Sequence, residues 1–122
     1  GGGWQVRDFV YVDGAADAFL RAGASGAGDG GVFNVGGDQP ISHRDLVTLL
    51  VDTACSGSVR YVQWPPDKQR IDIGSFYSDS TKFKEAVGWA PRVRLEDGLR
   101  RTIDFYRQHM HEYVDASGSE VR

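Results

Sequence analysis

Eight residues near the start of the chain set its expected architecture: Val6-Arg7-Asp8-Phe9-Val10-Tyr11-Val12-Asp13. From Phe9 to Val12 every residue is aromatic or β-branched, which favours a strand that is buried on both faces. Arg7 precedes this run, so the sequence predicts a fixed positive charge at the end of a buried strand. A guanidinium group in that position can bind two phosphate oxygens at once. The alternative is a solvated arginine that pairs with Asp8 or another neighbour.

The same stretch continues into a predicted helix. Asp13 can cap its first turn, and Gly23 ends it. The apolar residues between them recur at helical spacing and are expected to be buried: Val12, Ala16, Phe19 and Leu20. A second helix is expected to begin at Ser42, which forms a capping signal with Asp45 three residues later.

Signals for short strands and helices alternate along the rest of the chain. The sequence predicts strands at residues 32–35 and 59–64. It predicts further helices from about Asp79 to Val87, closed by Gly88, and from about Leu95 to Tyr113. The alternation indicates an α/β fold, and the small number of strands indicates an incomplete sheet.

Three segments outside these elements have the composition of a ligand-binding loop. Residues 26–31 formally match the dinucleotide-binding pattern Gly-x-Gly-x-x-Gly, but we reject the match because a predicted helix, not a strand, precedes it. Gly36-Gly37 predicts a tight turn that a ligand could approach closely. Residues 67–78 mix charges, glycine and aromatic side chains without helical periodicity, which is typical of a structured loop over a ligand.

The bulk composition excludes several classes of function. The 122 residues carry a net charge of −3, so no nucleic-acid partner is expected. No apolar run approaches the roughly 18 residues that a bilayer-spanning helix needs, so no membrane partner is expected either. The single Cys55 cannot form an internal disulfide, which favours a cytoplasmic location, and its apolar surroundings predict a buried thiol. His109 and His111 face different sides of one helix, so no metal site is expected.

Five blocks of the chain resemble, in this order, the extended short-chain dehydrogenase/reductase family, specifically its NAD-dependent nucleotide-sugar epimerases and dehydratases. The blocks are Arg7 to Ala18, Val32 to Gly37, Ser78 to Lys82, Gly88 to Pro91, and Leu95 to Leu99. Each block alone is a weak signal, whereas their order and spacing together are specific to the family. They do not specify a substrate.

The resemblance implies the C-terminal portion of a Rossmann-type protein with its small α/β substrate-binding lobe. Residues 1–37 would complete the edge of the cofactor-binding sheet, and residues 38–114 would form the nucleotide-sugar-binding lobe. Residues 115–122 are polar and small and are expected to be a flexible tail. The expected partners are a nucleotide-diphosphate sugar and either the missing N-terminal Rossmann portion or another copy of the chain.

The resemblance also implies substrate-binding residues. Arg7 is similar to the family's arginine that contacts the diphosphate. The family usually has a second arginine a few residues before an aspartate, and Arg70 with Asp72 matches it, or Gln69 occupies the contact position instead. Phe76 or Tyr77 would lie near the sugar or the base. The expected substrate contacts are, in full: Arg7, Gln69, Arg70, Asp72, Phe76 and Tyr77.

Two guanidinium groups from distant segments would neutralise a diphosphate, and each charge-assisted hydrogen bond contributes about 1.5–3 kcal/mol. The alternative for Arg70 is an ion pair with Asp67 or Asp72.

Two departures from the family also stand out at helix starts: Gly14 replaces a common acidic residue, and Arg94 replaces a common capping hydroxyl, which predicts a weaker cap for the last helix.

No tyrosine in the chain has a lysine four residues later, and no glycine-rich turn opens a first strand-to-helix unit. The family's Tyr-x-x-x-Lys pair and its cofactor loop are therefore absent, and we assign no catalytic or cofactor-binding residue. The resemblance implies a parent enzyme that transfers a hydride to and from NAD through a keto-sugar intermediate, with NAD bound mainly by residues outside this chain. The alternative is a non-catalytic nucleotide-sugar-binding or assembly module from a truncated gene.

Overall fold

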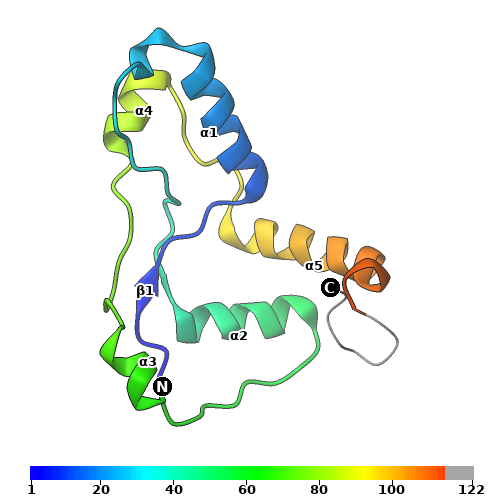
Figure 1. Cartoon of the computed structure of the whole chain (residues 1–122). Helices are drawn as coiled ribbons and strands as arrows, with labels where there is room; N and C mark the ends of the chain where they lie inside the picture. Colours follow the sequence, from blue (N-terminus) through cyan, green and yellow to red (C-terminus); the bar gives the residue numbers. More distant parts are fainter. Residues whose placement is uncertain (115–122) are drawn as a thin grey trace.

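The computed structural model describes residues 1–114 and contains short strands joined by helices (Figure 1). The expected flexible tail, residues 115–122, lies outside the described residues. The elements in chain order are β1 (Val6–Arg7), α1 (Val12–Ala24), the 3-10 helix η1 (Gly26–Gly28), β2 (Ile41–Ser42), α2 (His43–Ala54), α3 (Pro66–Arg70), α4 (Thr81–Val87) and α5 (Leu95–Tyr113).

Strand β1 is the centre of a small sheet. It pairs antiparallel with β2, so that Val6 lies opposite Ser42 and Arg7 opposite Ile41. A third segment follows the other edge of β1: the amide of Phe76 donates to the carbonyl of Val6 at 3.0 Å, and the amide of Val6 donates to Ser75 Oγ at 3.1 Å. The expected α/β class with an incomplete sheet is confirmed, in the form of two strands and one strand-like neighbour.

The three strands expected at residues 9–12, 32–35 and 59–64 are wrong. Residues 8–11, 31–39 and 56–65 have no regular secondary structure, and Phe9 and Val32 are 40% and 85% exposed. A strand needs hydrogen-bonding neighbours along its edges. The part of the chain that the structure describes offers none to these apolar segments, so they run as irregular or extended chain.

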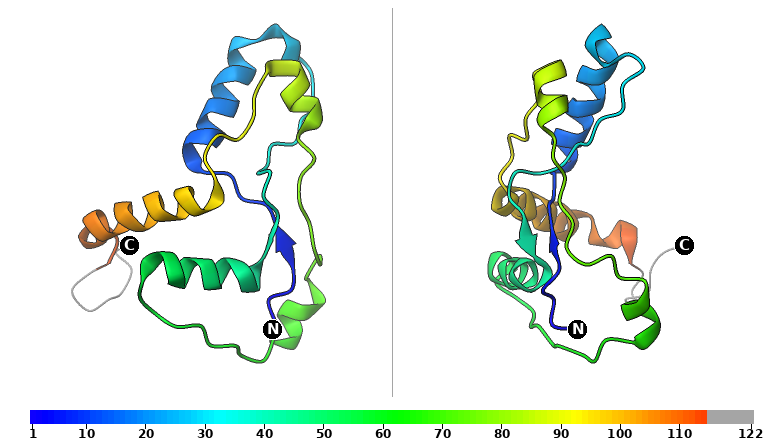
Figure 2. Two further views of the ribbon diagram at one scale, coloured as in Figure 1. Left: turned by 180° about the vertical axis from the view of Figure 1, so that it is seen from behind. Right: turned by 90° about the vertical axis from the view of Figure 1, so that its left-hand side faces the viewer.

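The helices form two groups. Figure 1 shows α1 beside α4 at one end of the molecule, and β1, α2 and α3 at the other, with α5 lying along α2. Both views in Figure 2 keep α1 and α4 together, far from α3. The guanidinium of Arg107 in α5 donates to the carbonyl of Ala54 at 2.6 Å, which fixes α5 against the end of α2.

The buried core is small and lies between α1 and α4. Ala18, Phe83 and Trp89 are at most 3% exposed, and the rings of Phe83 and Trp89 lie 5.6 Å apart. Trp89 Nε1 donates to the carbonyl of Gly14 at 3.0 Å, so its polar atom is satisfied inside the core. The ring centroids of Phe33 and Phe83 also lie 5.6 Å apart, so the cluster extends to the irregular segment 31–39, which contains Phe33.

The face of α1 that packs against the core is not the face that the sequence predicted. Val12, Phe19 and Leu20 are 67%, 80% and 73% exposed, and Ala16 is exposed too. The buried face consists of small residues around Ala18 instead. Both sides of the helix are apolar, and the described residues cover only one of them. The predicted stripe is therefore an apolar surface, but no other element of residues 1–114 packs on it.

The helix ends follow local signals in part. Ser42 Oγ accepts from the amide of Asp45 at 3.0 Å, which confirms the predicted cap of α2. Gly88 ends α4 in the left-handed conformation, as predicted. Asp13 does not cap α1, because Tyr11 is the N-cap residue and Asp13 already belongs to the first turn.

Two further helix ends depend on distant or unexpected residues. Arg94 makes no capping bond to α5, as predicted, but the side-chain oxygen of Gln39 accepts from the amide of Leu95 at 3.0 Å. Cys55 ends α2 in the left-handed conformation with φ 50° and is exposed, so the expected buried thiol is wrong. The thiol donates to the carbonyl of Asp52 in the last turn of the same helix at 3.4 Å.

None of the helices within residues 1–114 combines the length and the apolar composition that crossing a bilayer requires. In the same residues, no three histidine, cysteine or acidic side chains gather into a metal-binding group.

Candidate functional site

Arg7 stands at the end of β1 and is held by backbone oxygens. Its Nη1 donates to the carbonyl of Val6 at 2.7 Å and to that of Gly74 at 2.6 Å, in partly buried surroundings. These bonds use one of the three guanidinium nitrogens, so within residues 1–114 Nη2 and Nε keep donors for an anion. Arg7 does not pair with Asp8, which was the alternative considered from the sequence.

Asp8 points to a different part of the same loop. Its Oδ2 accepts from the amide of Ser78 at 3.2 Å. Side chains alternate along an extended chain, which explains why Arg7 and Asp8 reach different partners. The end of β1 therefore holds the segment from Gly74 to Ser78 at two places.

The turn at Gly36-Gly37 is filled by the protein, which corrects the expectation that a ligand approaches it. Gly36 is buried, and a Cβ on it would overlap Asp8 Oδ2. A Cβ on Gly37 would overlap the carbonyl oxygen of Phe9. The amide of Gly36 donates to Oγ of Ser80, which is only 5% exposed, at 2.9 Å. The glycines are needed for the close packing of chain segments.

The predicted second arginine takes its alternative partner. Arg70 Nη2 pairs with Asp67 Oδ1 at 2.9 Å at the surface, where both side chains are mostly exposed. Gln69 is exposed as well. Arg7 and Arg70 thus belong to separate contacts, and their convergence on one anion stays a prediction.

Asp72 and the aromatic residues lie on the loop beside β1. Asp72 Oδ2 accepts from the amide of Gly74 at 3.1 Å and from Gln5 Nε2 at 3.4 Å, so it shapes the turn that carries the Gly74 carbonyl to Arg7. Phe76 and Tyr77 are 54% and 60% exposed. Large exposed aromatic rings, on a loop that Arg7 holds through the carbonyl of Gly74, provide stacking surfaces for a planar base or a sugar.

The block from Ser78 to Lys82 has a structural role that the residues themselves explain. Asp79 Oδ1 accepts from the amide of Thr81 at 2.9 Å, and hydrogen bonds from Thr81 hold the pKa of Asp79 below its ordinary value. Lys82 Nζ donates to the carbonyl of Val32 at 3.0 Å and lies 4.8 Å from the ring of Phe33. The block therefore starts α4 and attaches it to the preceding loop.

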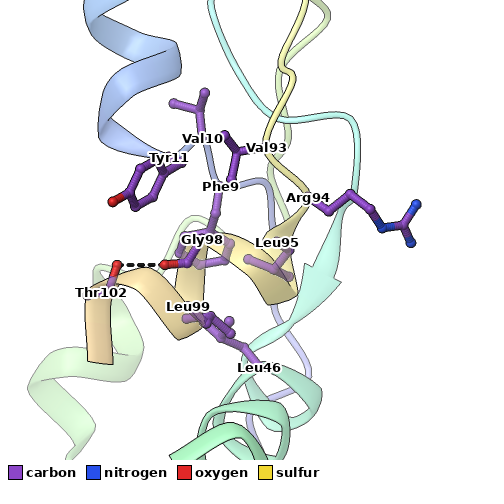
Figure 3. A pocket seen from close by; sticks show the side chains of 10 residues that line it. All are labelled: Phe9, Val10, Tyr11, Leu46, Val93, Arg94, Leu95, Gly98, Leu99 and Thr102. Atoms are coloured by element: carbon purple, nitrogen blue, oxygen red, sulfur yellow. Dashed lines mark hydrogen bonds between the residues drawn. The ribbon is translucent and has the colours of Figure 1, made fainter. Parts of the chain in front are cut away.

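Sequence reasoning missed an apolar cavity of about 220 Å³ between the start of α1, α2 and α5 (Figure 3). Its lining is mostly aliphatic and aromatic: Phe9, Val10, Tyr11, Leu46, Val93, Arg94, Leu95, Gly98, Leu99 and Thr102. Figure 3 shows the guanidinium of Arg94 directed away from the cavity, and Thr102 Oγ1 donates to the carbonyl of Gly98 at 2.8 Å. No free charged group enters it, so we place the candidate site at β1 instead.

Comparison with known proteins identifies relatives over most of the chain, although no family model matches. UDP-glucose 4-epimerase of Mycolicibacterium smegmatis is 36% identical over 107 residues, which cover 88% of this chain and 33% of that protein. dTDP-glucose 4,6-dehydratase of Streptomyces griseus is 35% identical over 111 residues, which cover 89% of this chain and 32% of that protein.

Solved structures agree with these relatives. UDP-glucose 4-epimerase of Thermotoga maritima, crystallised with UDP-glucose, superposes with a TM-score of 0.80 at 34% identity over 90% of this chain and 34% of its own. UDP-glucuronic acid 4-epimerase of Bacillus cereus, in complex with NAD, superposes with a TM-score of 0.73 at 26% identity over 88% of this chain and 33% of its own.

The fold and these superpositions define the class: the chain has the fold of part of a Rossmann-type α/β protein. More particularly, it is homologous to part of the extended short-chain dehydrogenase/reductase proteins, among their NAD-dependent nucleotide-sugar epimerases and dehydratases. This confirms the family predicted from the five blocks. The chain spans about a third of the length of the curated relatives it matches.

Proposed function

We propose that this chain is the substrate-binding, C-terminal portion of an NAD-dependent nucleotide-sugar epimerase or dehydratase. In this proposal the end of β1 and the loop beside it bind the diphosphate of a nucleotide sugar. The observation that carries it is the position of Arg7: a partly buried guanidinium, fixed by two backbone carbonyls, with donors left over. The similarity to an epimerase crystallised with UDP-glucose supports it.

A fixed arginine suits a diphosphate for physical reasons. Its side chain has already lost its rotamer freedom to the carbonyls of Val6 and Gly74, so binding costs less entropy than ordering a free surface arginine. The remaining donors can form charge-assisted bonds with phosphate oxygens. In the proposal, Arg70 and Gln69 complete the site after Arg70 exchanges its surface pair with Asp67 for the phosphate, while Phe76 and Tyr77 contact the sugar or the base.

The residues present do not fit NAD. The glycine-rich segment Gly26–Gly31 follows α1 and forms η1, so no helix N-terminus stands behind it to receive a pyrophosphate. The redox step and the Tyr-x-x-x-Lys chemistry therefore belong, in this proposal, to a part of the protein outside this chain. What this chain contributes is the binding and orientation of the substrate.

The uncovered face of α1 supports a place within a larger protein. Val12, Phe19 and Leu20 form an apolar surface on the helix that the family resemblance assigns to the edge of the cofactor-binding sheet.

Isothermal titration calorimetry with UDP tests the proposal on the chain itself. Arg7→Ala should weaken UDP binding roughly tenfold or more, because one charge-assisted bond contributes about 1.5–3 kcal/mol. Arg100→Ala is the matched control, since Arg100 pairs only with residues of its own helix, Glu96 and Asp97, among the described residues. Absence of binding to the unmodified chain, or equal loss in both variants, would overturn the proposal.

A further inference from the structure

The carboxylate of Asp8 lies at the meeting point of three segments. It follows β1 directly, its Oδ2 accepts from the amide of Ser78, and the same oxygen touches the backbone of Gly36. Behind Gly36, the buried Ser80 accepts from the Gly36 amide at 2.9 Å. The carboxylate is therefore enclosed on one side by a glycine that has no room for a side chain and on the other by the loop.

The residues next to Asp8 and Ser78 in the sequence are among those proposed to bind substrate. Arg7 precedes Asp8 in the chain, and Phe76 and Tyr77 immediately precede Ser78. Arg7 holds the loop at Gly74, four residues from the place where Asp8 holds it at Ser78. Two attachments on successive side chains fix both the distance and the twist of the loop relative to β1, which one attachment cannot do.

We infer that Asp8 is a positioning residue for the nucleotide-diphosphate site, and this inference rests on the proposed function. Asp8 acts through its bond to the Ser78 amide, which sets the loop carrying Phe76 and Tyr77 against Arg7. It does not touch the ligand itself, because a carboxylate beside a diphosphate would repel it and this one is already directed at a backbone donor.

The geometry predicts an order of affinities for UDP among substitutions at this position. Asp8→Asn keeps the size of the side chain and an acceptor oxygen for Ser78, so it should bind within about twofold of the unmodified chain. Asp8→Ala should lose roughly tenfold, the effect of one hydrogen bond to a charged group. Asp8→Glu keeps the charge but adds a methylene against Gly36, so it should also bind more weakly.

A double-substitution cycle in a background that carries Phe76→Ala and Tyr77→Ala separates positioning from a general loss of folded protein. If Asp8 acts by placing the loop that carries these two rings, Asp8→Ala should weaken UDP binding much less when both rings are already absent. An equal loss in both backgrounds would overturn the inference. If Asp8→Ala does not fold, Asp8→Asn and Asp8→Glu decide it: a role of the charge alone would leave the glutamate variant intact and impair the asparagine variant, the reverse of our expectation.

Amide hydrogen exchange without any ligand keeps this inference distinct from the proposed function. Asp8→Ala should speed exchange at Ser78 and Phe76 while leaving the amides in the middle of α2 unchanged, and Asp8→Asn should not. Failure of UDP to bind the unmodified chain would overturn the proposed function. Unchanged exchange at Ser78 in Asp8→Ala would overturn the positioning role, whatever the ligand result.

Discussion

Single side chains in this protein reach across long stretches of sequence to backbone groups. Arg7 binds the carbonyl of Gly74, Asp8 the amide of Ser78, and Trp89 the carbonyl of Gly14. The separations are 67, 70 and 75 residues. With a buried core that centres on a few residues, such bonds fix which segments lie together, while the apolar contacts supply only part of the stability.

Trp89→Phe should lower the free energy of unfolding by about 2 kcal/mol, because it removes the donor to Gly14 and leaves a gap in the core. Urea denaturation followed by far-UV circular dichroism measures the change. Trp4→Phe is the matched control, since Trp4 is 68% exposed and its replacement should change stability little. Equal effects of the two substitutions would contradict the role assigned to Trp89.

Acidification should weaken the start of α4 through Asp79. Hydrogen bonds from Thr81 lower the pKa of Asp79 from its ordinary value of 3.8 in the folded chain. The ionised form therefore stabilises the fold above that value, and the contribution disappears as the pH falls below it toward the lowered pKa. As the pH falls below 3.8, stability should decrease less steeply in Asp79→Ala than in the unmodified chain. Parallel curves would count against this account.

Residues whose partners are close in sequence could be predicted, and those with distant partners could not. The Ser42 cap and the Gly88 helix end follow from neighbours within four residues. The side chain of Gln39 accepts a hydrogen bond from the amide of Leu95, 56 residues later, and nothing in the sequence around Gln39 predicts this contact. Arg7 was identified by its position before an apolar run, whereas its bond to Gly74 depends on the tertiary fold.

At the level of elements, periodicity predicted α1, α2, α4 and α5 well and the strands poorly. It missed the short helix α3 (Pro66–Arg70), because most of its residues were expected to lie in a loop. The range of α5, Leu95–Tyr113, agrees with the prediction because a helix satisfies its own backbone. A strand depends on neighbours, and the apolar runs around Val10 and Phe33 have none among residues 1–114 to pair with. The stripe on α1 was likewise recognised as apolar but placed on the wrong side, because sequence does not say which of two apolar faces this chain covers.

Two glycine-to-alanine substitutions should have opposite effects on stability. Gly37→Ala places a Cβ against the backbone of Phe9 and should destabilise the fold by about 3 kcal/mol, the upper range for overpacking. Gly23 lies within α1 with open space around it, so Gly23→Ala should stabilise by about 0.5–1 kcal/mol. Thermal unfolding of both variants measures the difference. A neutral Gly37→Ala would contradict the close packing of this turn.

For the whole molecule, exposed apolar surface is the dominant feature. Among residues 1–114, three apolar residues are highly buried, and most of the apolar face of α1 is exposed. We therefore expect the isolated chain to be marginally stable and to associate with itself through that face. Covering the face would require a partner surface of an interface's usual size, which a protein three times as long can supply.

Sedimentation velocity over a wide concentration range should show association of the unmodified chain. Phe19→Ser combined with Leu20→Ser should reduce it, because both side chains are at least 73% exposed on α1. Trp4→Ser removes an exposed aromatic ring that contacts Arg44 of α2 and should leave the association unchanged. A concentration-independent monomer in the unmodified chain would contradict the expectation.

The central claim, that Arg7 and the loop beside β1 form a nucleotide-diphosphate site, is tested most directly by NMR titration of the 15N-labelled chain with UDP. The account predicts saturable shifts of the Arg7 Nε–H signal and of the amides from Gly74 to Ser78, with those in the middle of α5 unmoved. A spectrum that does not change, or shifts confined to helices away from β1, would contradict it.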